Sequence, residues 1–114
     1  MKEINNIFYN CEKLVNLNPN YFVFEESTKS KSLYLKVFDS DDKYKRSLIY
    51  TLRFSDHSHP INSKGYLFFD YWSSLSFEEF KYETRKYLLE RFDDYCYYGD
   101  LDRKDIEAVL SKIL

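Results

Sequence analysis

The sequence contains very little glycine, proline or cysteine, with two residues of each among 114. Two glycines are too few for a loop that cradles phosphate, and the sequence shows no phosphate-binding, dinucleotide-binding, nucleophile-elbow, zinc-peptidase or Cys-x-x-Cys motif. So little glycine and proline is also untypical of disordered, low-complexity chains. The sequence therefore favours a folded protein without catalytic activity.

Long apolar runs are absent as well. Every apolar run is shorter than a membrane span, and the first residues lack the apolar core of a signal peptide. We therefore expect a cytoplasmic protein that does not bind membranes. In that compartment Cys11 and Cys96 are expected to be reduced and buried within helices, with a structural disulfide as the alternative.

Charge of either sign is not in large excess, but it is unevenly distributed. The net charge is −2, and a mass of 14.0 kDa is typical of a single domain over residues 1–114. Residues 27–65 hold eight basic and four acidic side chains, a net +4, whereas residues 76–107 hold ten acidic and six basic ones, a net −4. Such asymmetry can steer a partner, but it is not the basic excess of a strong nucleic-acid binder.

Aromatic residues are abundant, at 20% of the chain, and they dominate the stretch 46–72. From Leu48 to Phe54 large side chains alternate with polar or smaller ones, which predicts a strand with Leu48, Tyr50, Leu52 and Phe54 on its buried face. A polar loop follows, and after Gly65 the aromatic run 66–72 predicts a central fourth strand.

The N-terminal half predicts one helix and two strands. Residues 3–16 place apolar side chains three and four positions apart, as in an amphipathic helix. Residues 21–25 and 33–38 predict paired strands, with Leu33, Leu35 and Val37 toward the core. The acidic segment 39–43 lacks the glycine and the closing glutamate of a calcium loop, so we expect a solvated turn.

The C-terminal part predicts two helices. Ser76 and Glu79 form a capping box at the start of the longest helix, and Gly99 is placed to end it. Asp102 or Asp100 then caps a last helix. We predict an α+β fold with a four-stranded antiparallel sheet, helices packed on one face and the order α-β-β-β-β-α-α.

The densest group of titratable side chains is Asp56, His57 and His59. A His-x-His pair with a carboxylate could bind zinc or iron, and Asp70 or a second subunit could complete the site. The group could instead perform general acid–base chemistry. A metal-dependent enzyme at this loop is the third functional hypothesis. We favour a polar loop with solvent-facing histidines, and we expect neither a metal nor a cofactor.

Tyrosine and basic residues interleave in the middle of the chain. Rings beside basic side chains on a sheet suit single-stranded nucleic acid, although the glycine-spaced aromatic pattern of common RNA-binding sheets is missing. Tyrosines can also simply cover an exposed sheet face. The candidate nucleic-acid-binding residues are Tyr34, Lys36, Lys45 and Arg46, and the wider set adds Phe38, Tyr44, Tyr50, Lys29 and Lys31.

The acidic C-terminal region permits a different hypothesis. Spaced carboxylates and phenols could bind the lysine and arginine side chains that normally neutralise phosphates in a nucleic-acid-handling protein. An ordinary solvated helix face would look similar. The candidate partner-binding residues are Glu79, Glu83, Glu90, Asp93, Asp94, Tyr97 and Tyr98. The rings of Tyr71 and Trp72 could equally form a homodimer surface.

Two short strings carry a resemblance. Residues 30–35 and 53–57 resemble the S-x-S-x-Y and R-x-S-D-H strings of small uncharacterised proteins from phages and mobile elements of AT-rich Gram-positive bacteria. The resemblance implies that Arg53, Ser55, Asp56 and His57 act together, as a ligand-facing polar row or as an internal salt-bridged turn. Some phage proteins of this size inhibit host defence complexes such as CRISPR effectors. We therefore expect a non-catalytic inhibitor of a host defence nuclease complex, in the host cytoplasm, with single-stranded nucleic-acid binding as the alternative.

Overall fold

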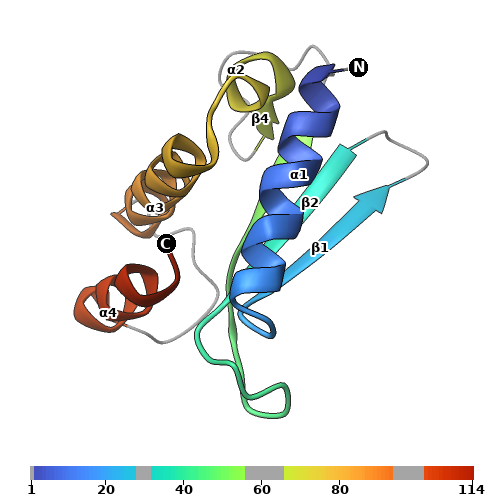
Figure 1. Ribbon diagram of the computed structural model, residues 1–114. Coiled ribbons are helices and arrows are strands. Elements are labelled where there is room, and N and C mark those ends of the chain that lie inside the picture. Colours follow the sequence, from blue (N-terminus) through green and yellow to red (C-terminus); the bar gives the residue numbers. More distant parts are fainter. Residues whose placement is uncertain (1, 28–31, 56–65, 94–101) are drawn as a thin grey trace.

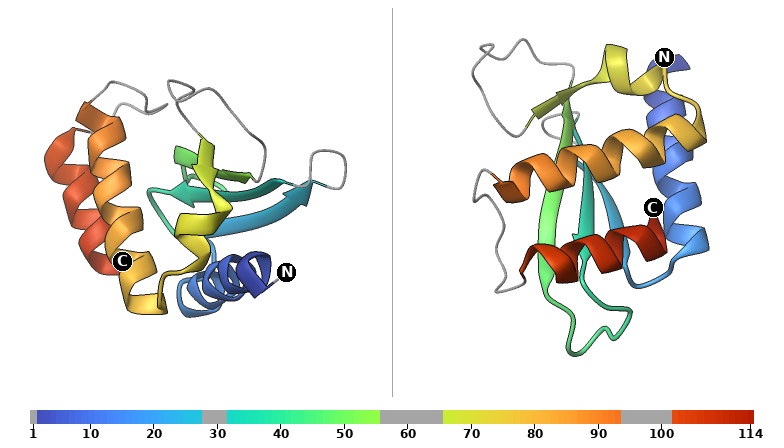
Figure 2. Two further views of the ribbon diagram at one scale, coloured as in Figure 1. Left: turned by 90° about the horizontal axis from the view of Figure 1, so that it is seen from above. Right: turned by 90° about the vertical axis from the view of Figure 1, so that its left-hand side faces the viewer.

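The computed structural model describes residues 2–27, 32–55, 66–93 and 102–114. The fold class is α+β, as predicted, with the helices on one side of a sheet (Figures 1 and 2). No helix in these four segments is both long enough and apolar enough to span a membrane. The elements are α1 (Lys2–Leu17), β1 (Phe22–Ser27), β2 (Ser32–Phe38), β3 (Leu48–Ser55), β4 (Tyr66–Phe68), α2 (Phe69–Ser73), α3 (Phe77–Asp93) and α4 (Arg103–Ile113).

Three antiparallel strands form the main part of the sheet. β1 pairs with β2 from Phe22↔Val37 to Ser27↔Ser32, and β2 pairs with β3. The predicted core face of β2 is confirmed, because Leu33, Leu35 and Val37 are buried. In an antiparallel pair, residues directly opposite each other share a face of the sheet, so this register also sets which residues of β1 and β3 face the helices.

A β-bulge changes one side-chain assignment in β3. Val37 pairs with Tyr50 while Phe38 pairs with Leu48, so Ile49 is an extra residue on β3. Ile49 is 1% exposed and lies in the core, whereas Leu48 is only partly buried. The prediction that Leu48 belongs to the buried row is therefore wrong, because the extra residue shifts the alternation at the start of the strand.

The fourth strand lies beside β3, but it is parallel to β3 and not antiparallel. Arg53 pairs with Tyr66 and Ser55 with Phe68. The predicted antiparallel meander is wrong at this point. A parallel neighbour requires the chain to return to the start of the ladder, and this ladder has only three residue pairs, about 7 Å from first to last at 3.3 Å per residue.

The predicted aromatic strand 66–72 is half strand and half helix. Its second part is α2, an additional helix absent from the predicted order. The reason is packing: Trp72 is buried, and its ring lies edge-on to Phe54 and Phe80, with centroids 5.5 Å and 5.6 Å away. Tyr71 is exposed, so the predicted Tyr71–Trp72 surface keeps only its tyrosine. A short aromatic run does not distinguish a strand from a buried helical turn by periodicity.

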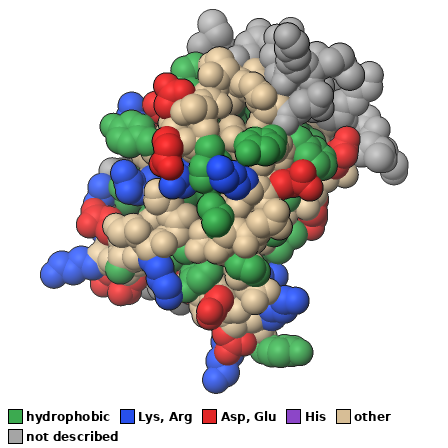
Figure 3. Space-filling model, viewed as in Figure 1, with side chains coloured by type: hydrophobic (Ala, Val, Ile, Leu, Met, Phe, Trp, Pro, Cys, Tyr) green, Lys and Arg blue, Asp and Glu red, His purple; other side chains and the backbone are tan. Residues whose placement is uncertain are grey.

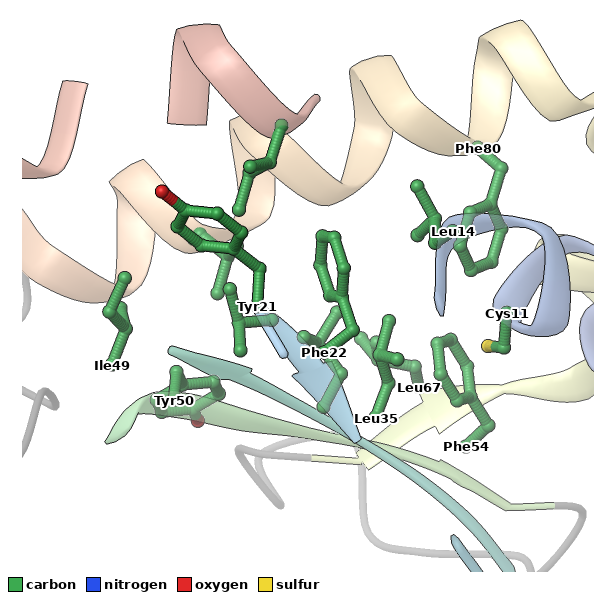
Figure 4. Close-up of a cluster of buried hydrophobic side chains, with 14 of the residues drawn as sticks. Cys11, Leu14, Tyr21, Phe22, Leu35, Ile49, Tyr50, Phe54, Leu67 and Phe80 are labelled. Atoms are coloured by element: carbon green, nitrogen blue, oxygen red, sulfur yellow. The ribbon is translucent and has the colours of Figure 1, made fainter. Parts of the chain in front are cut away.

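The core lies between the sheet and the helices. Figure 4 shows Cys11 and Leu14 of α1, Phe80 of α3 and Phe54 of β3 in one cluster. Cys11 is a buried free thiol, as predicted, and burial raises its pKa. The second cysteine, Cys96, and Gly99 lie outside the described residues. The last helix begins as predicted, because the Asp102 side chain accepts a hydrogen bond from the Asp105 N–H at 3.0 Å.

Two asparagines of α1 and one just after it fasten this helix to the C-terminal half of the chain. Asn6 Nδ2 donates to the Ser73 carbonyl at 2.7 Å, and Asn10 Nδ2 donates to the Leu75 carbonyl at 3.3 Å. Asn18, just after the helix, donates to the carbonyl of Ile113 at 3.4 Å. Ser73 and Ile113 end α2 and α4, where carbonyls lack partners within their own helix, whereas Leu75 lies between α2 and α3.

Candidate partner-binding surface

The described part of the predicted partner-binding set lies on α3. Glu79, Glu83 and Glu90 recur at spacings of four and seven, so they share the outer side of this helix. Asp93 is the last residue of α3, and its side chain is not among those described. Asp94, Tyr97 and Tyr98 lie outside the described residues.

Glu79 caps the start of α3. The Ser76 N–H donates to Glu79 Oε1 at 2.8 Å, and the Glu79 N–H donates to Ser76 Oγ at 3.2 Å. The capping box is therefore confirmed. The hydrogen bonds from the Ser76 backbone and hydroxyl lower the pKa of Glu79. Its carboxylate is committed to the helix end, which leaves Glu83 and Glu90 as the freer acids of the set.

The capping box predicts an acid-sensitive contribution to stability. Because the pKa of Glu79 is lower in the folded state, its stabilising effect is fully present above the ordinary glutamate pKa and is lost as the pH falls through the folded value. Glu79→Ala should therefore lower Tm at neutral pH and lower it less in acid, measured by circular dichroism from pH 7 to about pH 3. Glu79→Gln, which can still accept the bond, is the control. Equal Tm values for Glu79→Ala and the wild type at every pH would contradict the role.

Two half-exposed tyrosines lie beside these acids. Tyr71 on α2 and Tyr82 on α3 are 51% and 55% exposed. Partial desolvation and the charge and hydrogen bond of the Glu83 carboxylate raise the pKa of Tyr71, and Lys86 lies close enough to oppose that shift. The guanidinium of Arg85 lies 6.0 Å from the centroid of the Tyr82 ring. We name this surface the α2–α3 patch: Tyr71, Tyr82, Glu83, Lys86 and Glu90.

The α2–α3 patch is less acidic than the sequence suggested. Residues 77–93, which form α3, hold five acidic and four basic side chains, and acidic and basic side chains are interspersed over the face shown in Figure 3. Most of the acidic excess of residues 76–107 comes from Asp94, Asp100 and Asp102 between the two helices. The sequence indicates Tyr71 only as a candidate homodimer residue and not as part of the partner-binding set, because it predicts a strand there.

The candidate nucleic-acid-binding residues are divided between a sheet face and a turn. Tyr34 and Lys36 alternate with the buried residues of β2, so they lie on the face that the helices leave open. Lys36 Nζ lies 3.3 Å from Glu25 Oε1. Tyr50, a member of the wider set, is buried on the opposite face, so that part of the interpretation is wrong.

Lys45 and Arg46 belong to the turn between β2 and β3. The guanidinium of Arg46 lies 3.8 Å from the Phe38 ring centroid and donates to the Asn20 carbonyl. Tyr44 is 98% exposed at the tip of this turn, and Lys45 is exposed. Lys29 and Lys31 lie outside the described residues. Arg46 is thus stacked on the Phe38 ring of the open face, whereas Lys45 is exposed to solvent.

The resemblance residues are only partly described. Arg53 is exposed and pairs with Tyr34 across the open face. Ser55 ends β3, and its side chain is not described. Asp56, His57 and His59 lie outside the described residues, and Asp70 belongs to α2 and not to a strand beside them.

In the acidic turn 39–43, aspartate carboxylates accept hydrogen bonds from nearby backbone N–H groups. Asp39 Oδ1 accepts from the Ser47 N–H at 2.7 Å, and Asp42 Oδ1 accepts from the Tyr44 N–H at 3.0 Å. Within segments 2–27, 32–55, 66–93 and 102–114, no cluster of three histidine, cysteine or acidic side chains could hold a metal ion. The sequence predicts a solvated turn, and the structure adds that two of its carboxylates accept hydrogen bonds from the backbone.

Comparison with known proteins adds no relative: no family model, curated protein or solved structure matches this chain. The interpretation of its function therefore depends on the surfaces described above.

Proposed function

We propose that this protein is a non-catalytic phage or mobile-element protein that binds a host complex handling nucleic acid, such as a CRISPR effector, and inhibits it through the α2–α3 patch. The observation that carries the proposal is the pair of half-exposed tyrosines, Tyr71 and Tyr82, set beside Glu83 on two consecutive helices. The predicted partner-binding set also includes Asp94, Tyr97 and Tyr98, which lie outside the described residues.

Tyrosine and carboxylate together suit a basic protein surface. A tyrosine ring contributes a large contact area at a small entropic cost, and its hydroxyl offers a hydrogen bond. The charge and hydrogen bond of the Glu83 carboxylate contribute to the raised pKa of Tyr71, so the two side chains lie close together in the patch. Carboxylates at this spacing compete for arginine and lysine side chains that would otherwise contact phosphates. Occupation of such a groove excludes the nucleic acid.

The proposal predicts which single changes abolish binding. Glu83→Lys and Tyr82→Ala should each weaken binding to the captured host complex by about tenfold or more, because each removes a central contact of the patch. The complex is first isolated with the tagged protein from a nuclease-treated Gram-positive lysate, and its nuclease activity is then titrated with each variant. Loss of inhibition in parallel with loss of binding is the expected result.

The matched control is Glu107→Lys, which makes the same charge change on the exposed side of α4. It should leave binding and inhibition within about twofold of the wild type. If Glu83→Lys and Tyr82→Ala inhibit as well as Glu107→Lys does, the α2–α3 patch is not the inhibitory surface.

Single-stranded nucleic-acid binding on the open sheet face is the second candidate. It is favoured by Tyr34 and Phe38 on the same face as Lys36, with Arg46 stacked on Phe38. Fluorescence anisotropy of a labelled oligonucleotide should then show salt-dependent binding that Tyr34→Ala weakens. No binding at about 50 mM salt would remove this candidate.

A further inference from the structure

An open groove lies between α1 and the edge strand β1. β1 lies on the opposite side of the molecule from α3 (Figure 1). Among the described residues, β1 is an edge strand that pairs with β2 alone. Two adjoining hollows share Val15 of α1 and Phe24 of β1. Their full lining is Glu12, Val15, Asn16, Pro19, Asn20, Phe22, Val23, Phe24, Lys43 and Arg46.

The register shows which backbone groups face this groove. The Tyr21 carbonyl accepts from the Phe38 N–H at 2.8 Å, so Tyr21 faces β2. Since alternate residues of a strand direct their backbone groups to opposite edges, Phe24 and Glu26 direct theirs outward. Phe22 belongs to the same outward row, but its outward backbone groups already face Pro19 in an isolated β-bridge. Phe24 and Glu26 have no outward backbone partner among the described residues.

The walls of the groove are apolar at the centre and charged at both ends. The Phe24 ring packs edge-on against Phe8, with centroids 4.9 Å apart, and Val15 lies beside it. Glu26 is exposed at the end of β1, and Glu12 of α1 is exposed in the hollow that it shares with Phe24. Lys43 and Arg46 line the other end, next to Phe22. Two copies of β1 paired antiparallel through their open positions, with Phe24 opposite Glu26, would place Glu25 of one copy opposite Glu25 of the other, which disfavours self-pairing.

We infer that this groove binds an extended segment of a partner protein, which adds to β1 as an antiparallel fifth strand. Antiparallel addition places the start of the segment beside Glu26 and its end beside Lys43 and Arg46. The segment therefore carries a basic residue, an apolar residue two positions later and an acidic residue two positions after that. The apolar residue fits over Phe24 and Val15, and the edge amides supply the ladder of hydrogen bonds. This surface is separate from the α2–α3 patch and does not depend on the function proposed for it.

The probe is a synthetic, end-capped peptide of sequence lysine-threonine-isoleucine-threonine-aspartate. It is titrated into the isotope-labelled protein and followed by amide NMR. We expect saturable shifts centred on Phe24, Glu26 and Val15. The charge-reversed peptide, with aspartate first and lysine last, should bind about tenfold more weakly.

N-methylated peptides test the ladder without any change to the protein. Methylation of the isoleucine nitrogen, which faces β1, should weaken binding about tenfold, because it removes a ladder donor and adds a clash. Methylation of the second threonine nitrogen, which faces away, should leave binding within about twofold. Equal binding of the two methylated peptides would overturn the inference. Shifts confined to another surface, or shifts of Phe24 and Glu26 on concentration of the protein alone, would overturn it as well.

Discussion

Replacing Phe80 with alanine should lower the free energy of unfolding by about 3–5 kcal/mol, the usual cost of deleting a large buried ring. Phe80 is completely buried on α3, and its ring contacts those of Trp72 and Phe54, with centroids 5.6 Å and 6.0 Å away. Small domains are stable by only about 5–15 kcal/mol, so this change alone would bring the protein close to unfolding. Urea denaturation followed by circular dichroism measures the effect.

Tyr82→Ala on the same helix is the matched control. This side chain is 55% exposed, and its removal should change stability by about 0.5 kcal/mol or less. The comparison separates the loss of core packing from any general effect on α3. A similar urea midpoint for both variants would mean that α3 does not pack against Trp72 and Phe54 as described.

Replacing Thr84 with valine should raise the free energy of unfolding by about 1–2 kcal/mol, an unusual direction for a core substitution. Thr84 is fully buried on α3, and its Oγ1 has no hydrogen-bond partner among the described residues. A buried hydroxyl without a partner costs about 1–3 kcal/mol, and valine keeps the shape while removing that cost. The same urea experiment measures the gain.

Thr84→Ser separates the hydroxyl from the methyl group at this position. Serine keeps the polar atom and removes the packed methyl, so it should be less stable than the wild type. If valine is the destabilising change and serine is tolerated, the hydroxyl is satisfied in solution, for example by an ordered water molecule.

The elements that could be predicted from the sequence are those with local signals. The α1 periodicity, the alternation in β2 and the capping pair Ser76 and Glu79 all depend on spacings within one element. The structure bears them out because no distant contact competes with them. The bulge at Ile49 has no such signal, since it arises where β3 must fit β2 and the helices at once.

The errors in the prediction for residues 66–72 have one cause, which is a long-range packing contact. The run 66–72 has strand composition throughout, but Trp72 lies in the pocket formed by Phe54 and Phe80, which ends β4 after three residues and turns the chain into α2. Only the tertiary arrangement decides where the strand ends and the helix begins. The same turn exposes Tyr71 beside Glu83, so the α2–α3 patch could be predicted only in its α3 part.

The asparagine contacts of α1 also bear on how the chain folds during synthesis. Asn6 and Asn10 bond residues 67 and 65 positions later, and Asn18 bonds a carbonyl 95 positions later. At about 5–20 residues per second, a ribosome needs about 3–13 s to make 65 residues. During that interval the apolar side of α1, with Ile7, Cys11 and Leu14, has only the three antiparallel strands to cover it. The newly made N-terminal half is therefore a natural substrate for ribosome-associated chaperones, and its native position on the sheet becomes fixed only after α2 and α4 emerge.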